Sequence, residues 1–343
     1  MSDKFGIGVV GIGMAAKPHM KSLDDLRDTV DVRGVFSRQP EPRAAFCRAW
    51  DFPEATSLQG LIDDPALDAL IVLTPANART AIVEAAAKAG KHILMEKPVE
   101  RTTDAAQHIV STCDTSGVTL GIVFQHRFRA GSLALRDRIS AGALGDLANA
   151  YLVVPWWRPQ SYYDEPGRGT LERDGGGVLI SQAIHSMDLL LSLTGPVAEV
   201  QAIAGTSKVH DMETEDFVGA GLRFANGALG SIMATVANFP GDAEYMVLNF
   251  TNCAAKLSGG TLQLNWHDGR TETIGEDTAT GGGADPMDFP HDWHKAQIVD
   301  FIDAVKTNRQ PMSTGHTALE VHRLIDAILA SSATGQKTAV ASA

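Results

Sequence analysis

The chain has 343 residues, of which 44% are hydrophobic and 20% are charged, and its 41 acidic residues against 29 lysines and arginines give a formal net charge of -12. Chains longer than roughly 250 to 300 residues usually divide into domains, and an acidic protein repels nucleic acid and anionic lipid. We therefore expect two globular domains and neither a nucleic-acid nor a membrane partner. The three widely spaced cysteines predict neither a disulfide framework nor a zinc site.

The first third of the chain alternates strand-length apolar runs with helix-length amphipathic stretches, which is typical of βαβ units and a parallel sheet. The expected strands are 5–10, 30–36, 69–73, 92–95 and 119–124, and the expected helices are 15–26, 41–50, 78–89 and 103–116. We predict a doubly wound Rossmann domain over 1–125, with ligands at the carboxyl ends of the strands. The start of the chain fits this strand-turn-helix pattern better than a signal peptide, so we expect a cytoplasmic protein.

The remainder of the chain, 126–343, predicts an α+β domain with a mainly antiparallel open sheet. Strand candidates follow one another there at 197–204, 217–224, 228–236 and 245–250. The pair Asn226-Gly227 predicts a type I′ hairpin turn, in which both central residues have positive φ. We also expect a glycine-rich loop at 281–283, closing helices at 293–306 and 316–330, and a frayed tail after 334.

A phosphate-binding turn is predicted directly after the first strand. Gly11-Ile12-Gly13-Met14-Ala15-Ala16 matches the G-x-G-x-x-G/A pattern and opens a helix. The first glycine allows a tight turn, the second lets the backbone approach a pyrophosphate, and helix N–H groups receive the anion. We expect Gly11, Ile12, Gly13 and Met14 to bind a dinucleotide; the alternative is a glycine-rich turn without a ligand.

The end of the second strand favours NADP over NAD. A carboxylate at this position would bind the ribose 2′-hydroxyl and repel a 2′-phosphate, but the sequence has Ser37 and Arg38 there and no acid until Glu41. A guanidinium suits a 2′-phosphate, and Arg43 could add a second cation. The alternative is that Arg38 is a solvated loop residue.

The segment Glu96-Lys97-Pro98 follows the expected strand 92–95, where a doubly wound sheet presents catalytic groups. Desolvation lowers the pKa of a lysine, so a partly buried lysine can exchange a proton with a reacting oxygen. In the alternative interpretation, the lysine is exposed and neutralised by its neighbour Glu96.

Four segments together resemble the Gfo/Idh/MocA oxidoreductases, and the loop over 155–170 with Gly169-Thr170 and the Gln182-x-x-His185 variant is similar to the branch of phthalate cis-dihydrodiol dehydrogenases and related sugar dehydrogenases. The four segments are Val9-Val-Gly-Ile-Gly13, Leu73-Thr-Pro75, Met95-Glu-Lys-Pro98 and Gly175-Gly-Gly-Val-Leu-Ile-Ser-Gln-Ala-Ile-His185-Ser-Met-Asp188. The resemblance implies hydride transfer to or from a nicotinamide, with Lys97 and His185 as catalytic residues, and a homo-oligomer, dimer or tetramer, formed through the open sheet. It also implies cofactor contacts at Thr74, Pro75, Asn77, Glu96, Lys97 and Gln125.

The chain departs from the family pattern near the histidine. Many members carry an aspartate four residues before it, where this sequence has Ser181. One α-helical turn would place Ser181 and His185 on the same face, so a neutral hydroxyl replaces a carboxylate that raises the basicity of an imidazole. We expect His185 to be a weaker base and Lys97 to carry more of the proton transfer. Asp188 could partly substitute for the missing carboxylate.

An aromatic segment over 155–170 predicts a substrate-binding loop. Trp156, Trp157, Tyr162 and Tyr163 offer flat faces that suit a sugar or a cyclic diol. Arg158 and Arg168 could bind a carboxylate with two hydrogen bonds. The alternative is a covering loop whose aromatic side chains are core. The further candidates for substrate contacts are Lys97, Arg127, Ser181, Gln182, His185 and His294.

These expectations describe a dehydrogenase or reductase that uses NADP, or else NAD, and acts on a secondary alcohol or ketone of a sugar or polyol. A dehydrogenase of a carboxylated cyclic cis-dihydrodiol is the alternative within the family. Two other classes stay open: a non-catalytic NADP(H)-binding regulatory protein, and a metal-dependent hydrolase built around His291 and His294. Two histidines at this spacing without a third ligand are a weak zinc signature, so we predict no metal.

Overall fold

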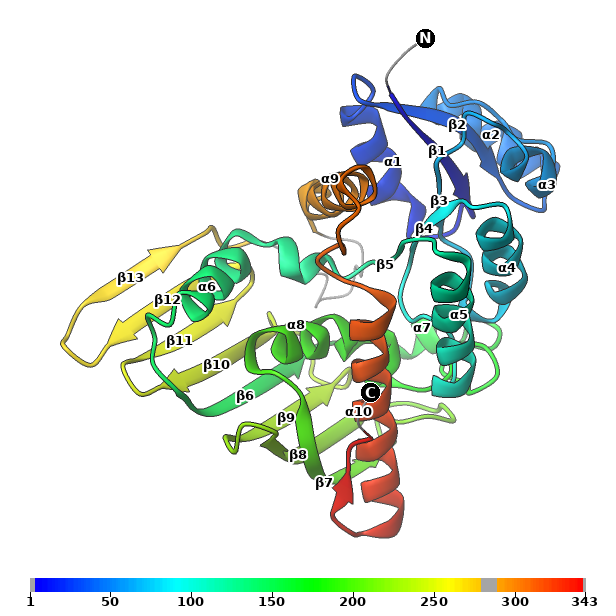
Figure 1. Ribbon diagram of the computed structural model, residues 1–343. Coiled ribbons are helices and arrows are strands. Elements are labelled where there is room, and N and C mark those ends of the chain that lie inside the picture. The colour runs from blue at the N-terminus through cyan, green and yellow to red at the C-terminus, as the bar shows by residue number, and fades with distance from the viewer. Residues whose placement is uncertain (1–3, 279–288, 342–343) are drawn as a thin grey trace. The chain divides into compact units, whose positions relative to one another are not determined.

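The computed structural model describes residues 4–278 and 289–341, so the expected glycine-rich loop at 281–283 lies outside the described residues. The chain forms two compact units, one made of residues up to Val123 with Pro290–Ala318, the other of Phe124–Phe289 with the residues from Leu319 onward (Figure 1). The first unit therefore includes α9 (Asp292–Thr307), which the sequence placed in the second domain. None of the helices in the described ranges combines the length and the apolarity that a bilayer crossing requires.

The first unit is built on a parallel sheet in the strand order β2-β1-β3-β4-β5. The strands are β1 (Phe5–Val10), β2 (Val30–Phe36), β3 (Ala69–Val72), β4 (His92–Met95) and β5 (Leu120–Ile122). Val10 lies opposite Val72, and Val72 lies opposite Met95. Because the strands are parallel and in this register, the loops that follow β1, β3 and β4 leave the sheet at one edge.

Helices cover both faces of this sheet, as Figure 1 shows. They are α1 (Ala16–Asp25), α2 (Pro40–Trp50), α3 (Leu58–Ile62), η1 (Ala76–Ala78), α4 (Thr80–Lys88) and α5 (Thr103–Ser116), together with α9. Local signals fix their ends: the Thr102 hydroxyl accepts a hydrogen bond from the Ala105 N–H at the start of α5, and Gly117 ends that helix with a φ of 68°. Met20 of α1 and Phe301 of α9 are buried in one core with Ile7 of β1.

The second unit contains a nine-stranded sheet in the order β13-β12-β11-β10-β6-β9-β8-β7-β14. Its strands are β6 (Leu147–Pro155), β7 (Val197–Gly205), β8 (Phe217–Phe224), β9 (Leu229–Thr235), β10 (Tyr245–Phe250), β11 (Cys253–Ser258), β12 (Thr261–Trp266), β13 (Thr271–Ile274) and β14 (Thr338–Ala339). Strands β6 and β9 pair in parallel, and every other neighbouring pair is antiparallel. The expected mainly antiparallel sheet is confirmed.

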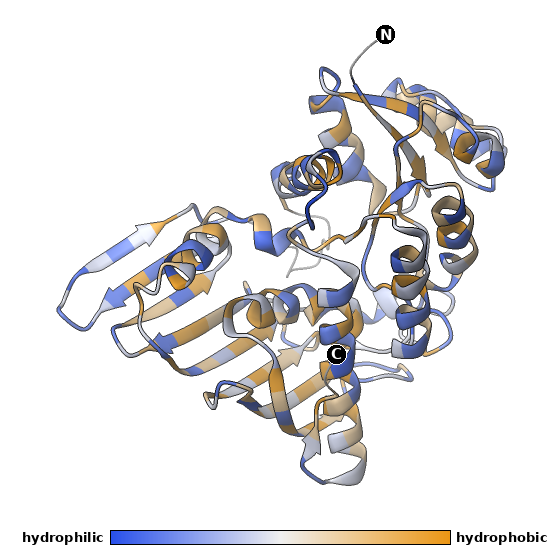
Figure 2. Cartoon of the chain, viewed as in Figure 1, coloured by the Kyte–Doolittle hydropathy of each residue, from blue (hydrophilic) through white to orange (hydrophobic). Residues whose placement is uncertain are grey.

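One face of the large sheet is buried and the other carries exposed apolar side chains. Hydrophobic and hydrophilic residues alternate along its strands (Figure 2), as a sheet with one covered face requires. Its helices are η2 (Gln125–Phe128), α6 (Ala130–Ser140), α7 (Gln160–Tyr163), η3 (Leu179–Ala183), α8 (Ile184–Thr194) and α10 (Gly315–Thr334), the last shared with the first unit. By strand register, the exposed Tyr151, Ile203, Phe217 and Leu229 belong to the open face.

Two local expectations in this unit are wrong. Strands β8 and β9 do form a hairpin, but Gly227 has a φ of 90° while Asn226 is outside the positive-φ region. The Gly227 N–H donates to the Phe224 carbonyl and the Phe224 N–H to the Ala228 carbonyl, which is a three-residue loop with its glycine in the left-handed region rather than a type I′ turn. The tail after 334 is not simply frayed, because β14 pairs with β7.

Candidate functional site

The turn after β1 has the geometry of a phosphate cradle. Gly11 has a φ of 108°, and a Cβ there would come within 2.9 Å of the Leu73 carbonyl carbon, so the turn needs glycine. A Cβ at Gly13 would meet nothing within 4 Å among the described atoms, and the first turn of α1, whose residues are all described, holds no acidic side chain. These residues fit a pyrophosphate, which would bind to the exposed backbone at Gly13 and the N–H groups of α1.

The loop after β2 contains the exposed Arg38, and its backbone is held by a hydrogen bond from the buried Arg43. Arg38 is exposed and Ser37 is half-buried. Arg43 is buried, with its Nε 2.8 Å from Glu54 Oε1 and its Nη1 donating over 2.7 Å to the Ser37 carbonyl. The structure corrects the expectation for Arg43: it supports the backbone of this loop and is paired with Glu54, so Arg38 is the cation that remains for a 2′-phosphate.

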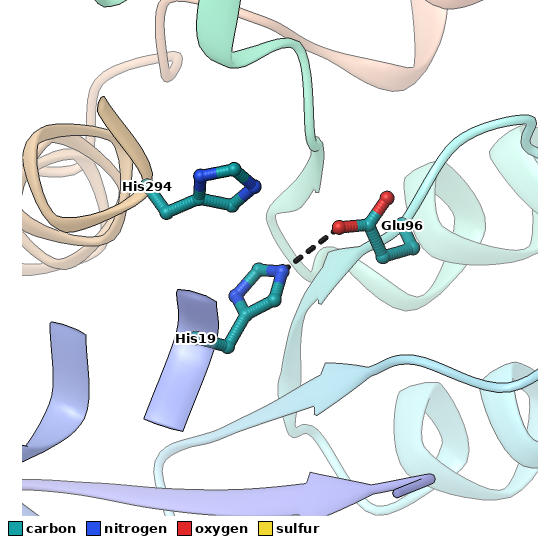
Figure 3. A group of neighbouring side chains, drawn as sticks. All are labelled: His19, Glu96 and His294. Carbon is teal, nitrogen blue, oxygen red and sulfur yellow. Dashed lines mark hydrogen bonds and ion pairs between the residues drawn. The ribbon is translucent and has the colours of Figure 1, made fainter. Parts of the chain in front are cut away.

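Lys97 lies between two tightly held residues at the carboxyl end of β4. Its own side chain is partly exposed, whereas the neighbouring Glu96 is buried and accepts a hydrogen bond of 2.8 Å from His19 Nε2 (Figure 3). Burial opposes ionisation of Glu96, but the hydrogen bond from His19 and the charge of Lys97 hold the pKa of this carboxyl below its usual range. Glu96 is thus an interior anion bound to His19 at the edge of the sheet where the cofactor is expected.

Arg79 joins the loops after β3 and β4 and was not anticipated from the sequence. Its Nε and Nη2 donate to the Thr74 carbonyl over 2.9 and 2.8 Å, and its Nη1 donates to the carbonyls of Glu96 and Pro98. Burial lowers the pKa of Arg79 to about 10, although Glu96 and Glu100 counteract it, so the guanidinium stays protonated at neutral pH.

The loop after β3 places the other expected cofactor residues at the same edge of the sheet. Pro75 and Asn77 are exposed, Ile12 is half-buried and Met14 is 50% exposed. The Thr74 hydroxyl is buried and has no hydrogen-bond partner within the described ranges. These side chains are therefore placed where a dinucleotide bound at the glycine turn can reach them.

His294 lies in the interior of the first unit. It is 3% exposed, its ring packs edge-on against His19 with centroids 5.0 Å apart, and burial lowers its pKa to about 3, so it is neutral. This position corrects the expectation that His294 borders the substrate pocket. The nearby His291 instead lies 3.1 Å from Asp25 Oδ2, so the two histidines do not form the site that a hydrolase would need.

His19, Glu96 and His294 carry donor atoms within 4.8 Å of one another, and these donor types can bind a metal ion. Ligands of a tetrahedral zinc ion at 2.0–2.1 Å lie about 3.3 Å apart. The cluster would have to contract, and it would have to break the hydrogen bond between His19 and Glu96, before it could bind such an ion.

In the second unit, His185 lies at the start of α8, next to two aromatic side chains. It is 8% exposed, with Phe124 edge-on at 6.0 Å and His126 at 5.2 Å between ring centroids. The preceding segment η3 is π-helical, and a π-helix has a wider turn than an α-helix. The assumption that one α-helical turn separates Ser181 from His185 is therefore wrong.

Arg127 and Asp188 form a buried ion pair that connects η2 to α8. Arg127 Nε and Nη2 donate to the two carboxylate oxygens of Asp188, each over 2.6 Å, and Asp188 is fully buried. Burial raises the pKa of Asp188 against the opposing effect of Arg127. The structure thus corrects two expectations: Asp188 binds Arg127 rather than substituting for the missing carboxylate, and Arg127 is engaged with Asp188 rather than presented to a substrate.

A second buried network orients His126. Arg129 Nη1 lies 2.5 Å from Glu244 Oε1, and its Nη2 lies 2.8 Å from His126 Nε2. Because arginine can only donate, His126 Nε2 accepts this hydrogen bond. Gln125 and Gln182 are also buried, and their side-chain oxygens have no hydrogen-bond partner within the described residues. Two unsatisfied amides on η2 and η3 are acceptors that a hydroxyl-rich ligand could use.

The aromatic segment expected to bind substrate is packed on an internal histidine. His210 lies 2.8 Å from Asp216 Oδ2 through Nδ1 and 2.8 Å from the Arg158 carbonyl through Nε2. Trp157 and Tyr163 pack against its ring, with centroids 6.0 and 5.0 Å away. Arg158 is 2% exposed, so it cannot clamp a carboxylate from solvent, and the alternative of a covering loop is favoured.

A phosphate cradle, an edge-of-sheet lysine and an attached antiparallel domain define the class of nicotinamide-dependent oxidoreductases. The chain matches the family "Oxidoreductase family, NAD-binding Rossmann fold" over residues 5–124 and "GFO/IDH/MocA C-terminal domain" over residues 132–254. It belongs to the Gfo/Idh/MocA family of oxidoreductases, and the proteins it is similar to include sugar and polyol dehydrogenases.

Three relatives illustrate this membership. The 1,5-anhydro-D-fructose reductase of Ensifer adhaerens is 28% identical over 288 residues, covering 82% of each chain. The scyllo-inositol 2-dehydrogenase (NADP(+)) IolW of Bacillus subtilis is 27% identical over 57% of this chain and 55% of its own. The WlbA dehydrogenase from Bordetella pertussis, solved with NADH and UDP-GlcNAcA, is 27% identical with a TM-score of 0.83 over 99% of this chain and 100% of its own.

Proposed function

We propose that the protein is a dehydrogenase or reductase that prefers NADP and acts on a secondary alcohol or ketone of a sugar or sugar-like polyol. The observation that carries this proposal is the common edge of the first sheet. Gly13 follows β1, Thr74 follows β3 and Lys97 follows β4, and the paired register of these strands brings the three loops to one edge. A dinucleotide held by the first two loops would present its reactive ring near the third.

The preference for NADP rests on the loop after β2. Arg38 is exposed, Ser37 offers a hydroxyl, and the neighbouring Arg43 is paired with Glu54 and cannot replace Arg38. Relatives do not decide the matter, because IolW is named for NADP(+) while the WlbA structure contains NADH. The test is the ratio of kcat/KM for NADP and NAD in Arg38→Glu and in Arg48→Glu, a matched change on exposed helix surface. Only Arg38→Glu should reverse the preference for NADP over NAD. An unchanged ratio in Arg38→Glu would contradict the proposed role of Arg38.

We assign the proton transfer to Lys97 and His185. The bound nicotinamide supplies or accepts the hydride. When the substrate is oxidised, Lys97 takes the proton of its hydroxyl; when a ketone is reduced, Lys97 returns that proton and its charge stabilises the developing alkoxide. His185 shares this proton through a ring nitrogen, and Gln125 and Gln182 offer hydrogen-bond acceptors to neighbouring hydroxyls.

The burial of Arg158 favours neutral sugars and polyols over carboxylated cyclic diols as substrates. A carboxylated cyclic diol needs a cation at the site, and Arg158 and Arg127 are both enclosed in contacts of the second unit. Neutral sugars and polyols need hydroxyl partners instead, and these fit the buried amides of Gln125 and Gln182. A panel of sugars, inositols and carboxylated dihydrodiols, followed by reduced-nicotinamide absorbance, decides between them. Turnover of dihydrodiols alone would favour the alternative.

We also propose a homo-oligomer that covers the open face of the large sheet. Ile203 is 76% exposed and Leu229 is 52% exposed, and both lie on this face with Tyr151 and Phe217. Apolar side chains gathered on an uncovered sheet are a surface that a second copy of the chain can bury.

A non-catalytic regulatory role is the competing proposal from another class, motivated by Ser181 in place of the family's aspartate. Cofactor binding without turnover of any member of the panel would favour it. Turnover that is lost in Lys97→Met, with the cofactor still bound, would exclude it.

A further inference from the structure

We propose that Arg79, His19 and Glu96 form an anchor that fixes the backbone on both sides of Lys97 and so positions its ammonium for proton transfer. This inference rests on the proposed role of Lys97. We call these three residues the Lys97 anchor.

The first support is the pattern of bonds that Arg79 makes. One guanidinium donates to the carbonyls of Glu96 and Pro98, the two residues that flank Lys97, and to the carbonyl of Thr74 in the neighbouring loop. Carbonyls at the ends of two strands are thus held by one planar, rigid fork of donors. A lysine or a neutral amide at position 79 could not make this set of contacts, because neither has the fork.

The second support is that the side chain of Glu96 is fixed independently of its backbone. His19 of α1 donates to the carboxylate over 2.8 Å, and the ring of His294 of α9 packs edge-on against His19. Figure 3 shows the imidazole of His19 directed at the Glu96 carboxylate, with His294 beside them. Residue 96 is therefore held at its carbonyl by Arg79 and at its carboxylate by His19, which leaves little freedom to the backbone that begins Lys97.

The third support is that the anchor buries charged side chains, although such burial adds little to the stability of the fold. Arg79 and Glu96 are 3% and 7% exposed, and buried charged side chains contribute little stability compared with apolar residues of similar volume. A buried charged cluster instead fixes the positions of the groups that it binds. Lys97 is the residue that lies between these fixed groups. The turn that holds a proton-transfer group needs this precision, because a misplacement of about 1 Å can lower the rate by about 100-fold.

The charges around the cluster favour an anchor over a metal site. The charges of Arg79 and Lys97 already act on the anion Glu96 or are acted on by it, and Glu100 is a second anion near Arg79. A divalent cation held by His19, Glu96 and His294 would add two positive charges beside those two cations, and it would displace the hydrogen-bonding proton of His19. We therefore assign the pair His19 and Glu96 to positioning.

The experiment compares matched variants of the full-length protein with the substrate found in the panel. His19→Gln keeps an N–H donor near the position of Nε2 and should stay within about 3-fold of the wild-type kcat, whereas His19→Leu and Arg79→Lys should lower kcat by about 10- to 100-fold. The dissociation constant of the nicotinamide, measured by fluorescence, should change by less than about 2-fold in all three. In His19→Leu, loss of the hydrogen bond that lowers the pKa of Glu96 should also move the lower limb of the pH profile of kcat to higher pH, which a purely structural defect would not do.

Wild-type kcat in folded His19→Leu and Arg79→Lys, or an equal loss in His19→Gln and His19→Leu, would overturn the anchor. If Arg79→Lys does not fold, the two His19 variants decide by the same criteria. Stoichiometric Zn²⁺ in the purified protein, lost in His294→Ala, would overturn it as well. Lys97→Met separates the two proposals: full activity in this variant refutes the role of Lys97, whereas an inactive Lys97→Met beside a fully active Arg79→Lys refutes only the anchor.

Discussion

The buried pair of Arg127 and Asp188 gives the sharpest stability prediction. Asp188→Asn keeps the shape of the side chain but removes the charge that faces Arg127, whose guanidinium side chain is 10% exposed. Glu320 is a further anion whose charge acts on Arg127. The variant therefore replaces a carboxylate that accepts two hydrogen bonds from Arg127 with a neutral amide that has one acceptor oxygen.

The expected loss follows from the burial of both partners. Removal of one partner from a buried ion pair costs about 3–5 kcal/mol, whereas replacement of both by apolar residues of similar volume is near neutral. We expect Asp188→Asn to lower the free energy of unfolding by about 3 kcal/mol or more and Arg127→Met with Asp188→Leu to recover most of that loss. Asp24→Asn is the control, since its ion pair with Arg27 is exposed and should contribute less than about 1 kcal/mol.

Urea denaturation followed by circular dichroism measures these differences, with Trp fluorescence as a second probe. Coincident transitions by the two probes are needed before free energies are compared, because the chain has two compact units. A loss below about 1 kcal/mol in Asp188→Asn, or a double variant as unstable as the sum of the two single changes, would refute the account of this pair.

The remaining predictions concern catalysis, acid stability, the aromatic segment and assembly. Lys97→Ala should lower kcat/KM more than His185→Ala, because Ser181 leaves His185 without a neighbouring carboxylate; steady-state kinetics of both variants measure this, and a greater loss in His185→Ala contradicts it. Burial lowers the pKa of His322 to about 4, below its unfolded value near 6.5, so the unfolded chain binds more protons between these values and stability falls as pH falls through this window, by about 2 kcal/mol near pH 5. His322→Leu should flatten that acid dependence in urea titrations, and an unchanged slope argues against the assignment. His210→Phe should expose the segment around Trp157 to limited proteolysis, because Asp216 and the Arg158 carbonyl lose the histidine that contacts both of them; wild-type resistance would contradict this. Ile203→Asp should shift the protein to a smaller species in sedimentation velocity while Ser231→Asp, on the same face, has a weaker effect; a wild-type assembly in Ile203→Asp rules out this face as the interface.

The parts of the fold that the sequence predicted well are those specified by contiguous residues. The run from Val9 to Ala16 contains a strand, a tight turn and a helix start in one stretch, and β4 passes directly into Glu96-Lys97-Pro98. In both cases hydrophobic periodicity and glycine placement act over a few residues, so the local pattern was enough to place the loops at the edge of the sheet.

The parts that could not be predicted depend on partners far apart in the chain. His19 and Glu96 are separated by 77 positions, and Arg129 and Glu244 by 115, so no spacing rule connects them. The segment before His185 is π-helical, so the prediction of an ordinary α-helical turn there was wrong. The loop at Gly227 has three residues, one more than the two-residue turn that Asn226-Gly227 suggests. Arg43, Arg127 and Arg158 were predicted to contact the cofactor or the substrate, but their side chains are enclosed and bind other residues of the chain.

The most direct test of the central claim is the initial rate of reduced-nicotinamide formation by wild-type protein and Lys97→Met, measured with NADP and the full sugar and polyol panel. We predict turnover of at least one neutral secondary alcohol by the wild type, and a loss of about 100-fold or more in kcat for Lys97→Met, with the cofactor still bound. Wild-type rates in Lys97→Met, or no turnover of any alcohol although the cofactor binds, would contradict the account.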